Sequence, residues 1–550
     1  MASRLLSGYF MRHLVSSSAL LLVLAACEGA LPPPPPLLTV TSPQRSLIQT
    51  DGSQIVVQGT AVPGPSGDAV TSVTVNKVPA TLSADGSFTA TIAVPIGATL
   101  IETVATAGGV PATDARAVQI GQLRPVGTSI DRAVTAALSA QAFARLSAAA
   151  GPLIKNMDLT TLLAPMQPMA NLGDDIANVK ISITKLTLGD AKITLTPVGG
   201  GLAFSAELDT LNVTAKADYA GALVPDGTTT IGVTADQVTI SGTLNVTPAG
   251  TAGFTTKLVS PMVHTTNMKL TASGLVGAIL DLLNNNLAST IQSMTTQMAE
   301  SAMEPMLNDA LGALAGPQQI DVLGKKLDLQ ASPAAIAFSR DGAIVTMNLQ
   351  AKLEGSETSP GFVFTPNGAP AMTMTNGIQL ALADDLVNEM LAEVHALGVL
   401  DLSLQQDFGV FDNAEIKLTM PPMISANNSD GSMRLVLGDM MASFTDHGNP
   451  VITAAINAQV DLAILRGTNA QEIALQFGKA DLVVNVLSDT TGMLGGDDLE
   501  GPAGSGIAVQ LDSIKQFLVT VPVPSIAGVT LDNLSLHADS GYVLVAGDVH

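Results

Sequence analysis

Residues 511–549 decide the fold, and they read LDSIKQFLVTVPVPSIAGVTLDNLSLHADSGYVLVAGDV. The pattern predicts a helix over 507–518, a proline-marked turn at 521–524, and two closing strands over 529–536 and 541–549. A helix that leads through a proline turn into a final pair of strands places the end of the chain in a sheet. The rest of the second half extends this arrangement.

An amphipathic helix is predicted upstream, over 384–397. Its apolar residues recur at three- and four-residue spacing and share one face: Leu386, Met390, Val394 and Leu397. Another face carries Asp385, Glu389 and Glu393, and Gly398 is placed to end the helix. Strands are predicted on either side of it, at 327–331, 335–339, 344–353, 415–419, 433–437, 458–464 and 481–487.

The first half follows a similar plan, which suggests that two halves of about 200 residues repeat one arrangement. An Ala-rich helix is predicted over 129–153, followed by strands at 181–183, 193–195, 202–206, 238–240 and 244–246. A second helix is predicted over 275–303, and Pro305 should kink or end it. The apolar stripe of that helix is Leu280, Leu283, Leu287, Ile291, Met294 and Met298.

In this order the elements resemble the bactericidal/permeability-increasing protein and lipopolysaccharide-binding protein family of the tubular lipid-binding (TULIP) superfamily, over roughly 126–550. The resemblance implies an α+β fold, an elongated molecule of two barrels in which each curled antiparallel sheet packs on a long helix. The N-terminal barrel would span 122–316. Residues 317–550 would hold the central sheet and the C-terminal barrel.

The resemblance also implies that apolar grooves in the barrels hold acyl chains. The groove candidates lie on the two predicted helices: Leu283, Leu287, Ile291, Met294, Met298, Leu386, Met390, Val394 and Leu397. For each of them plain protein core is the alternative interpretation.

Three features depart from the family. The disulfide of its first barrel cannot form because Cys27 is the only cysteine. Residues 122–316 lack the basic excess with which bactericidal members engage lipid A. A Gly-rich stretch over 492–506 stands where a long helix is expected before the closing strands.

The N-terminus resembles a bacterial lipoprotein signal peptide. Arg4 and Arg12 precede an apolar run over 14–26 that ends in Leu24-Ala25-Ala26-Cys27, which is similar to a lipobox. We expect a signal peptide over 1–26 and fatty acylation of Cys27, with an ordinary secretory signal as the alternative. A proline-rich linker over 27–37 follows, and Glu28 in place of Asp favours the outer membrane, on its periplasmic face or at the cell surface.

Residues 38–121 alternate apolar and polar side chains in short runs separated by turn signals such as Asp51-Gly52 and Asp85-Gly86. The pattern predicts a β-sandwich. It resembles the bacterial immunoglobulin-like modules, which serve as spacers or bind carbohydrate.

The composition excludes some partners and favours others. A net charge of −23 at pH 7 would repel a nucleic-acid backbone. Only 13% of residues are charged, 47% are hydrophobic, and there are 21 methionines but no tryptophan. Few charges and many flexible methionines favour a fold with an apolar lumen, although an ordinary core would also use them.

Catalytic motifs are missing from the sequence. There is no HExxH, GxSxG or P-loop pattern among the histidines, serines and glycines. Asp446 and His447 are adjacent, and His537 lies near Asp539, but adjacent residues on a strand point to opposite faces. We interpret both pairs as surface loop or strand residues. The acidic residues Asp489, Asp497, Asp498 and Glu500 are interpreted as a solvated loop. We therefore expect no enzyme activity, no metal and no cofactor.

The sequence thus predicts an outer-membrane-anchored lipid-binding or lipid-transfer protein. Its partners would be a phospholipid, glycolipid or other hydrophobic ligand, and the membrane itself through the lipid on Cys27. The alternative is an interaction or adhesion scaffold whose immunoglobulin-like domain binds a glycan or a protein. A third hypothesis, an envelope hydrolase, would require His447 or His537 beside a carboxylate and a hydroxyl in a pocket.

Overall fold

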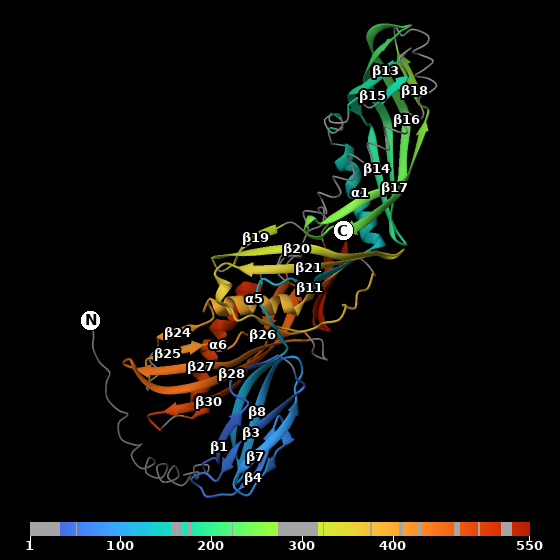
Figure 1. Ribbon diagram of the computed structural model, residues 1–550. Helices are drawn as coiled ribbons and strands as arrows, with labels where there is room; N and C mark the ends of the chain where they lie inside the picture. Colours follow the sequence, from blue (N-terminus) through green and yellow to red (C-terminus); the bar gives the residue numbers. More distant parts are fainter. Residues whose placement is uncertain are drawn as a thin grey trace, which may run out of the picture. The chain divides into compact units, whose positions relative to one another are not determined.

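The computed structural model describes residues 34–50, 52–155, 158, 160, 164, 167–168, 170–173, 178–222, 224–272, 317–322, 324–374, 377–405, 411–426, 432–466, 473–492, 495–518 and 531–549 (Figure 1). The chain divides into two compact units. The first comprises residues 1–44, 54–94 and 101–116, and the second comprises 45–53, 95–100 and 117–550. Of the described residues, 64% lie in strands and 13% in helices.

Residues 37–120 form two sheets. One has the order β1-β3-β7-β6, with β1 (Leu37–Ser42), β3 (Gln54–Val62), β6 (Thr81–Leu82) and β7 (Ser87–Ala93). The other has the order β2-β9-β8-β4-β5, with β2 (Leu47–Gln49), β4 (Val70–Val75), β5 (Val78–Pro79), β8 (Gly97–Ala107) and β9 (Val110–Ile120). Every second residue of β3 and β7 is buried, as the predicted sandwich requires.

Two curled sheets of the second unit have the same topology, as the repeated plan predicts. The first has the path β12-β13-β15-β16-β17, with β14 on β15 and β18 on β16; the second has the path β24-β25-β27-β28-β29, with β26 on β27 and β30 on β28.

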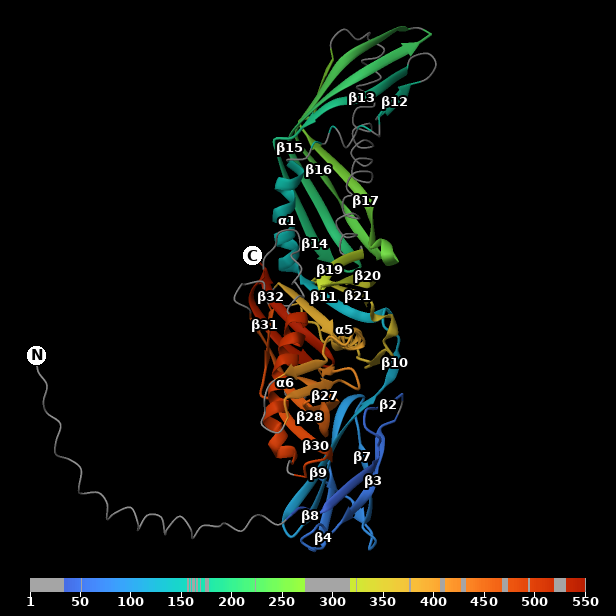
Figure 2. The same ribbon diagram turned by 90° about the vertical axis from the view of Figure 1, so that its left-hand side faces the viewer.

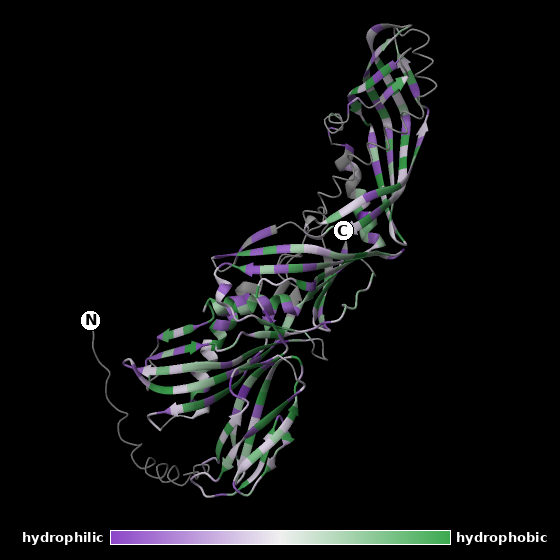
Figure 3. Cartoon of the chain, viewed as in Figure 1, coloured by the Kyte–Doolittle hydropathy of each residue, from purple (hydrophilic) through white to green (hydrophobic). Residues whose placement is uncertain are grey.

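The strands of the first curled sheet are β12 (Ala170–Gly173), β13 (Asn178–Thr187), β14 (Asp190–Val198), β15 (Gly201–Gly221), β16 (Val224–Pro248), β17 (Phe254–Thr266) and β18 (Lys269–Ala272). Those of the second are β24 (Leu402–Gln405), β25 (Asn413–Lys417), β26 (Met423–Ser425), β27 (Met433–Asp446), β28 (Asn449–Arg466), β29 (Ile473–Phe477) and β30 (Asp481–Asp489). Hydrophilic and hydrophobic residues alternate along the long strands (Figure 3).

The long strands β15 and β16 change their buried side midway. In β15 the even-numbered residues from Leu202 to Leu208 are buried, whereas beyond Thr210 the buried residues are Ala215 and Ala217. Thr210 has a φ of 53°, a left-handed conformation that interrupts the strand's alternation. The two halves of the sheet consequently belong to separate apolar clusters.

The central sheet joins strands from distant parts of the chain in the order β19-β20-β21-β11-β23-β32-β31. Its strands are β11 (Ile130–Ser139), β19 (Pro317–Val322), β20 (Lys325–Phe338), β21 (Gly342–Leu353), β23 (Ile378–Ala383), β31 (Leu531–Asp539) and β32 (Tyr542–Val549). A short ribbon pairs β10 (Gln122–Arg124) with β22 (Phe362–Phe364). The closing strands expected near the C-terminus are thus β31 and β32.

The described residues hold three α-helices and two short 3-10 helices. These are α1 (Ala140–Lys155), α5 (Asp384–Ala396), α6 (Gly496–Leu518), η2 (Gly250–Ala252) and η4 (Ser356–Thr358). Helix α1 lies along β14 (Figure 2). Helices α5 and α6 share the largest apolar cluster with β27 and β28.

Buried Asp439, which is 0% exposed, ties the segment after β1 to the second curled sheet. Its carboxylate pairs with the Arg45 guanidinium at 2.9 Å and accepts the backbone N–H groups of Ser46 at 2.7 Å and Ala117 at 3.0 Å. The side-chain amide of Asn457 donates to it as well, at 3.2 Å. Four donors around one buried carboxylate explain why this segment belongs to the second unit.

The expected α+β class is wrong, because the fold is mostly β, and the described residues contain only three α-helices beside the curled sheets. The N-terminal part of the helix predicted over 129–153 is strand β11, since this segment pairs with β21 and β23. The helix predicted over 275–303 lies outside the described residues.

The last helix is longer than predicted. It begins at Gly496 and not near residue 507, because its glycines let it approach the sheet closely. A Cβ atom on Gly506 would come within 2.6 Å of Ile416 Cδ1. The Gly-rich stretch is therefore the first half of α6.

Candidate functional site

The centre of β21 carries an apolar row that the protein covers only in part. Alternate residues of a strand point to one face, so residues 343, 345, 347, 349 and 351 form a single row. Ala343 and Ala351 are each 0% exposed, whereas Val345, Met347 and Leu349 between them are half-buried. The exposed fraction therefore rises in the middle of the row, whereas both ends of the row are fully buried.

This row continues across the neighbouring strands in register. Val345 lies opposite Ala136 of β11, and Met347 lies opposite Val134, which in turn lies opposite Leu382 of β23. All five residues are half-buried. Because directly opposed side chains are about 5 Å apart, they form one continuous surface, which we call the apolar band.

Helices cover the row on either side of the apolar band. Phe143 of α1 belongs to the same apolar cluster as Ala343. Leu391 of α5 belongs to the same cluster as Ala351. The apolar band thus lies between the part of the sheet covered by α1 and the part covered by α5.

The groove candidates that the structure describes lie outside the apolar band. Met390 and Val394 of α5 are buried in the largest cluster, and Leu386 and Leu397 pack against it. The other five candidates, Leu283, Leu287, Ile291, Met294 and Met298, lie outside the described residues, as does Cys27. The structure brings none of the four described candidates into the apolar band.

Helix α5 holds four connecting segments through buried carboxylates. Asp384 accepts the N–H of Ala426 at 2.9 Å. The other three bonds run from Thr365 N–H to Asp385 at 2.8 Å, from Gly127 N–H to Glu389 at 2.7 Å, and from Leu353 N–H to Glu393 at 3.0 Å. All four carboxylates are at most 2% exposed.

These carboxyl groups titrate far above their ordinary range. Burial, reinforced by the charge of Glu393, raises the pKa of Glu389 to about 8. Burial also raises the pKa of Asp385 to about 7, with the charge of Asp384 acting in the same direction, and that of Glu393 to about 7. The pKa of Asp384 is raised by burial too. Loss of the surrounding water disfavours the charged carboxylate, so the neutral form persists to higher pH.

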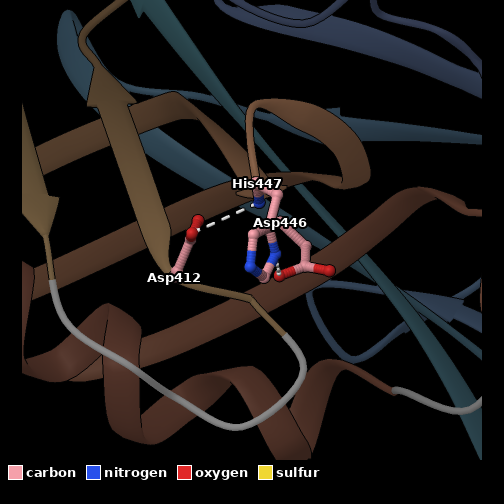
Figure 4. Close-up of side chains that lie close together, drawn as sticks. All are labelled: Asp412, Asp446 and His447. Atoms are coloured by element: carbon pink, nitrogen blue, oxygen red, sulfur yellow. Dashed lines mark hydrogen bonds and ion pairs between the residues drawn. The ribbon is translucent and has the colours of Figure 1, made fainter.

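A cluster of two aspartates and one histidine lies at the surface of the second curled sheet (Figure 4). Ligand atoms of Asp412, Asp446 and His447 lie within 4.8 Å of one another, so they could hold a divalent cation. His447 has a φ of 50° at the turn between β27 and β28, and its Nδ1 lies 2.7 Å from Asp446 Oδ1. This contact raises the pKa of His447.

Asp446 and His447 are surface residues, as predicted, but strand alternation does not separate them, because the turn sets the direction of His447 and brings its ring to Asp446. The imidazole is 84% exposed, so the cluster lies at the surface and not in a pocket. The predicted condition for a hydrolase, a histidine beside a carboxylate and a hydroxyl in a pocket, is therefore not met at His447.

A pocket of about 580 Å³ lies in the second unit. Its wall includes Met423, Val436 and Leu100, and its polar side includes Arg434 and Gln459. Arg434 Nε donates to Asp461 at 3.1 Å. The pocket is mixed in character, and it could not be predicted from the sequence because its walls come from five separate segments, 95–100, 365–367, 423–425, 434–436 and 459.

Sequence reasoning missed both the apolar band and the burial of the α5 carboxylates. The spacing of Asp385, Glu389 and Glu393 at four-residue intervals was visible, and it places them on one face of the helix. Burial of that face depends on four segments that lie far away in the sequence, so spacing alone could not reveal it.

Comparisons with known proteins give a weak likeness of fold. No family model matches the chain, and no curated protein matches its sequence. A crystal structure of lipopolysaccharide binding protein is 14% identical and covers 76% of this chain and 99% of its own, with a TM-score of 0.40.

Two further structures are less similar. P47 of Clostridium botulinum E1 is 8% identical over 77% of this chain and 100% of its own, with a TM-score of 0.27. P47 from Clostridium botulinum A2 is 7% identical over 76% and 98%, with a TM-score of 0.24. Separately, none of the helices in the described part of the chain has the length and hydropathy needed to span a bilayer.

Proposed function

We propose that this protein binds lipids and that the apolar band is where an acyl chain packs. The observation that carries the proposal is the break in burial along β21, where half-buried Val345 and Met347 lie between fully buried Ala343 and Ala351. A row of apolar side chains left half-covered between two helices is suited to an apolar chain that completes the cover.

The energy available at the apolar band is sufficient for useful affinity. Burying methylene groups contributes about 0.8 kcal/mol each, so about ten of them would contribute on the order of 8 kcal/mol before the entropy cost of association. No polar contact is needed for this gain. The mechanism therefore has no chemical step, and the protein would act as a carrier rather than as an enzyme.

We further propose that the protein is an outer-membrane lipoprotein, anchored through a lipid on Cys27 and facing the periplasm or the cell surface. The lipobox-like run Leu24-Ala25-Ala26-Cys27 supports this proposal. An anchored carrier would take its ligand from the membrane that holds it, and could pass the ligand to an acceptor.

A second candidate function rests on the sandwich over 38–121. The orders β1-β3-β7-β6 and β9-β8-β4-β5 correspond to the A-B-E-D and G-F-C-C′ orders of immunoglobulin sheets. This supports an immunoglobulin-like module that binds a glycan or a protein partner, with the remaining sheets as a scaffold. An apolar band that takes up no lipid would favour this alternative.

A charge placed in the apolar band tests the leading proposal. Met347→Glu puts a carboxylate among apolar neighbours, and Met262→Glu is the matched control because Met262 of β17 is 65% exposed. Both would be made in a chain with Cys27→Ser, so that the protein is purified without detergent.

Lipid retained by each protein is then extracted and quantified by mass spectrometry, and uptake of a fluorescent fatty acid from phospholipid vesicles is measured. We expect the control to retain and take up lipid and Met347→Glu to lose both properties while unfolding at a similar temperature. Equal lipid content in the two variants, or none in either, would contradict the proposal.

A further inference from the structure

Four carboxyl groups within one 13-residue helix are buried without a cation beside them. In the described part of the chain, no Lys, Arg or His nitrogen lies within 4.0 Å of Asp384, Asp385, Glu389 or Glu393. Glu389 Oε2 and Glu393 Oε2 are buried with no hydrogen-bond partner there. Buried carboxylates are ordinarily paired, so this arrangement suits neutral carboxyl groups.

The charged and titratable groups that face this row do not supply the missing counter-charge. Arg124 of β10 acts on Asp385, but it lies 3.4 Å from the centroid of the Phe364 ring. Lys352 of β21 acts on Glu393, but it pairs with Glu357 of η4 at 3.7 Å.

Tyr542 of β32 feels the charges of Asp384 and Asp385 in the first turn of α5, and its own pKa is raised mainly by burial. Arg132 of β11 acts on Tyr542 in the opposite direction. At the other end of the helix, burial lowers the pKa of His395, and the charge of Asp401 opposes this shift. None of these described groups forms an ion pair with the row, and burial raises the pKa of Asp385 and Glu393 despite the opposite charges of Arg124 and Lys352.

Ionisation would place like charges one helical turn apart in a site without water. Asp385, Glu389 and Glu393 follow one another at i, i+4 and i+8, and like charges at this spacing repel each other. Asp385 holds the segment after β22, Glu389 holds the segment between β10 and β11, and Glu393 holds the end of β21. Relief of the repulsion requires water to enter, which requires these segments to move away from α5.

We propose that α5 is a pH-controlled latch, which holds its four connecting segments while its carboxyl groups are neutral and releases them when the groups ionise in mildly alkaline solution. Helix α5 covers the Ala351 side of the apolar band, so release would also open that side. This consequence for the ligand rests on the proposed lipid binding, whereas the latch itself does not.

Hydrogen exchange measured by mass spectrometry at pH 6 and pH 9 tests the latch. The proteins compared are the wild type, the double variant Glu389→Gln with Glu393→Gln, and the control Glu415→Gln, whose side chain is exposed on β25. After correction for the intrinsic rate, we expect the wild type and the control to exchange about tenfold faster at pH 9 in peptides that contain Gly127, Leu353 or Thr365. The double variant should show no such change in the peptides that contain Gly127 or Leu353, which Glu389 and Glu393 hold.

Equal protection at both pH values in the wild type would overturn the latch, even if the double variant failed to fold. A double variant that opens as the wild type does would overturn the assignment to these two residues. Release of fluorescent fatty acid is followed in parallel. A protein that opens at pH 9 but never binds fatty acid would refute lipid binding while leaving the latch in place.

Discussion

Glu389→Gln should change how the stability of the protein depends on pH. The pKa of Glu389 is about 8 in the folded protein and 4.5 in an unperturbed glutamate. Between about pH 4.5 and about pH 8 the folded protein therefore binds more protons than the unfolded chain, and stability falls as the pH rises through this window. The amide of glutamine is uncharged throughout and still offers an oxygen to Gly127.

The magnitude follows from the difference in pKa. Each pKa unit corresponds to about 1.36 kcal/mol, so ionisation of Glu389 costs on the order of 5 kcal/mol of unfolding free energy above pH 8. The variant should match the wild type within about 1 kcal/mol at pH 5, where the wild-type carboxyl group is neutral in the folded state. At pH 9 the variant should be the more stable protein by several kcal/mol.

Urea unfolding followed by far-UV circular dichroism from pH 5 to pH 9 measures this difference. Glu415→Gln serves as the control for loss of one negative charge. Parallel stability curves for the wild type and Glu389→Gln would refute the conclusion that this carboxyl group is buried and neutral at pH 7.

Two further substitutions test the packing. Asp439→Ala should cost about 3–5 kcal/mol in urea unfolding, because it removes the charged partner of Arg45 and a buried acceptor; a loss below about 1 kcal/mol would show that the network is not essential. Gly496→Ala should cost about 1–3 kcal/mol, because its Cβ would collide with the carbonyl oxygen of Val484. Gly504→Ala, whose Cβ would make only an ordinary contact of 3.5 Å with Leu482, should stabilise α6 by about 0.5–1 kcal/mol. Thermal unfolding of the two glycine variants gives the signs, and equal effects would contradict the close approach of α6 to β30.

Strong periodicity made much of the fold predictable. The helix predicted over 384–397 is α5, which ends at Ala396. The strand predicted over 202–206 lies within β15, where buried and half-buried residues alternate as a strand requires. The repeat of one plan in two halves could be read from the order of elements, and the two curled sheets have the same topology.

Other segments could not be assigned from local signals. Ala133, Ala136 and Ala137 give residues 130–139 a high helix propensity, but the segment is the central strand β11 because it completes the sheet between β21 and β23. The glycines of α6 argue against a helix locally. They are explained by close contact with the sheet, which only the folded structure shows.

The candidate site was the least predictable part. The apolar band joins Val134, Val345 and Leu382, which are brought together by strand register over more than 200 residues of sequence. Composition indicated surplus apolar surface without indicating where it lies. The acidic row of α5 was visible as spacing, yet an acidic helix face is ordinarily solvated, so its burial could not be inferred.

Photo-crosslinking with a fatty acid that carries a diazirine on its acyl chain tests the central claim most directly. The full mature chain with Cys27→Ser is loaded from vesicles and irradiated, and the labelled peptides are identified by mass spectrometry. Lipid binding at the apolar band predicts label on peptides that contain Val134, Met347 or Leu382. Label confined to residues 38–121, or no label above that of an unrelated control protein, would contradict it.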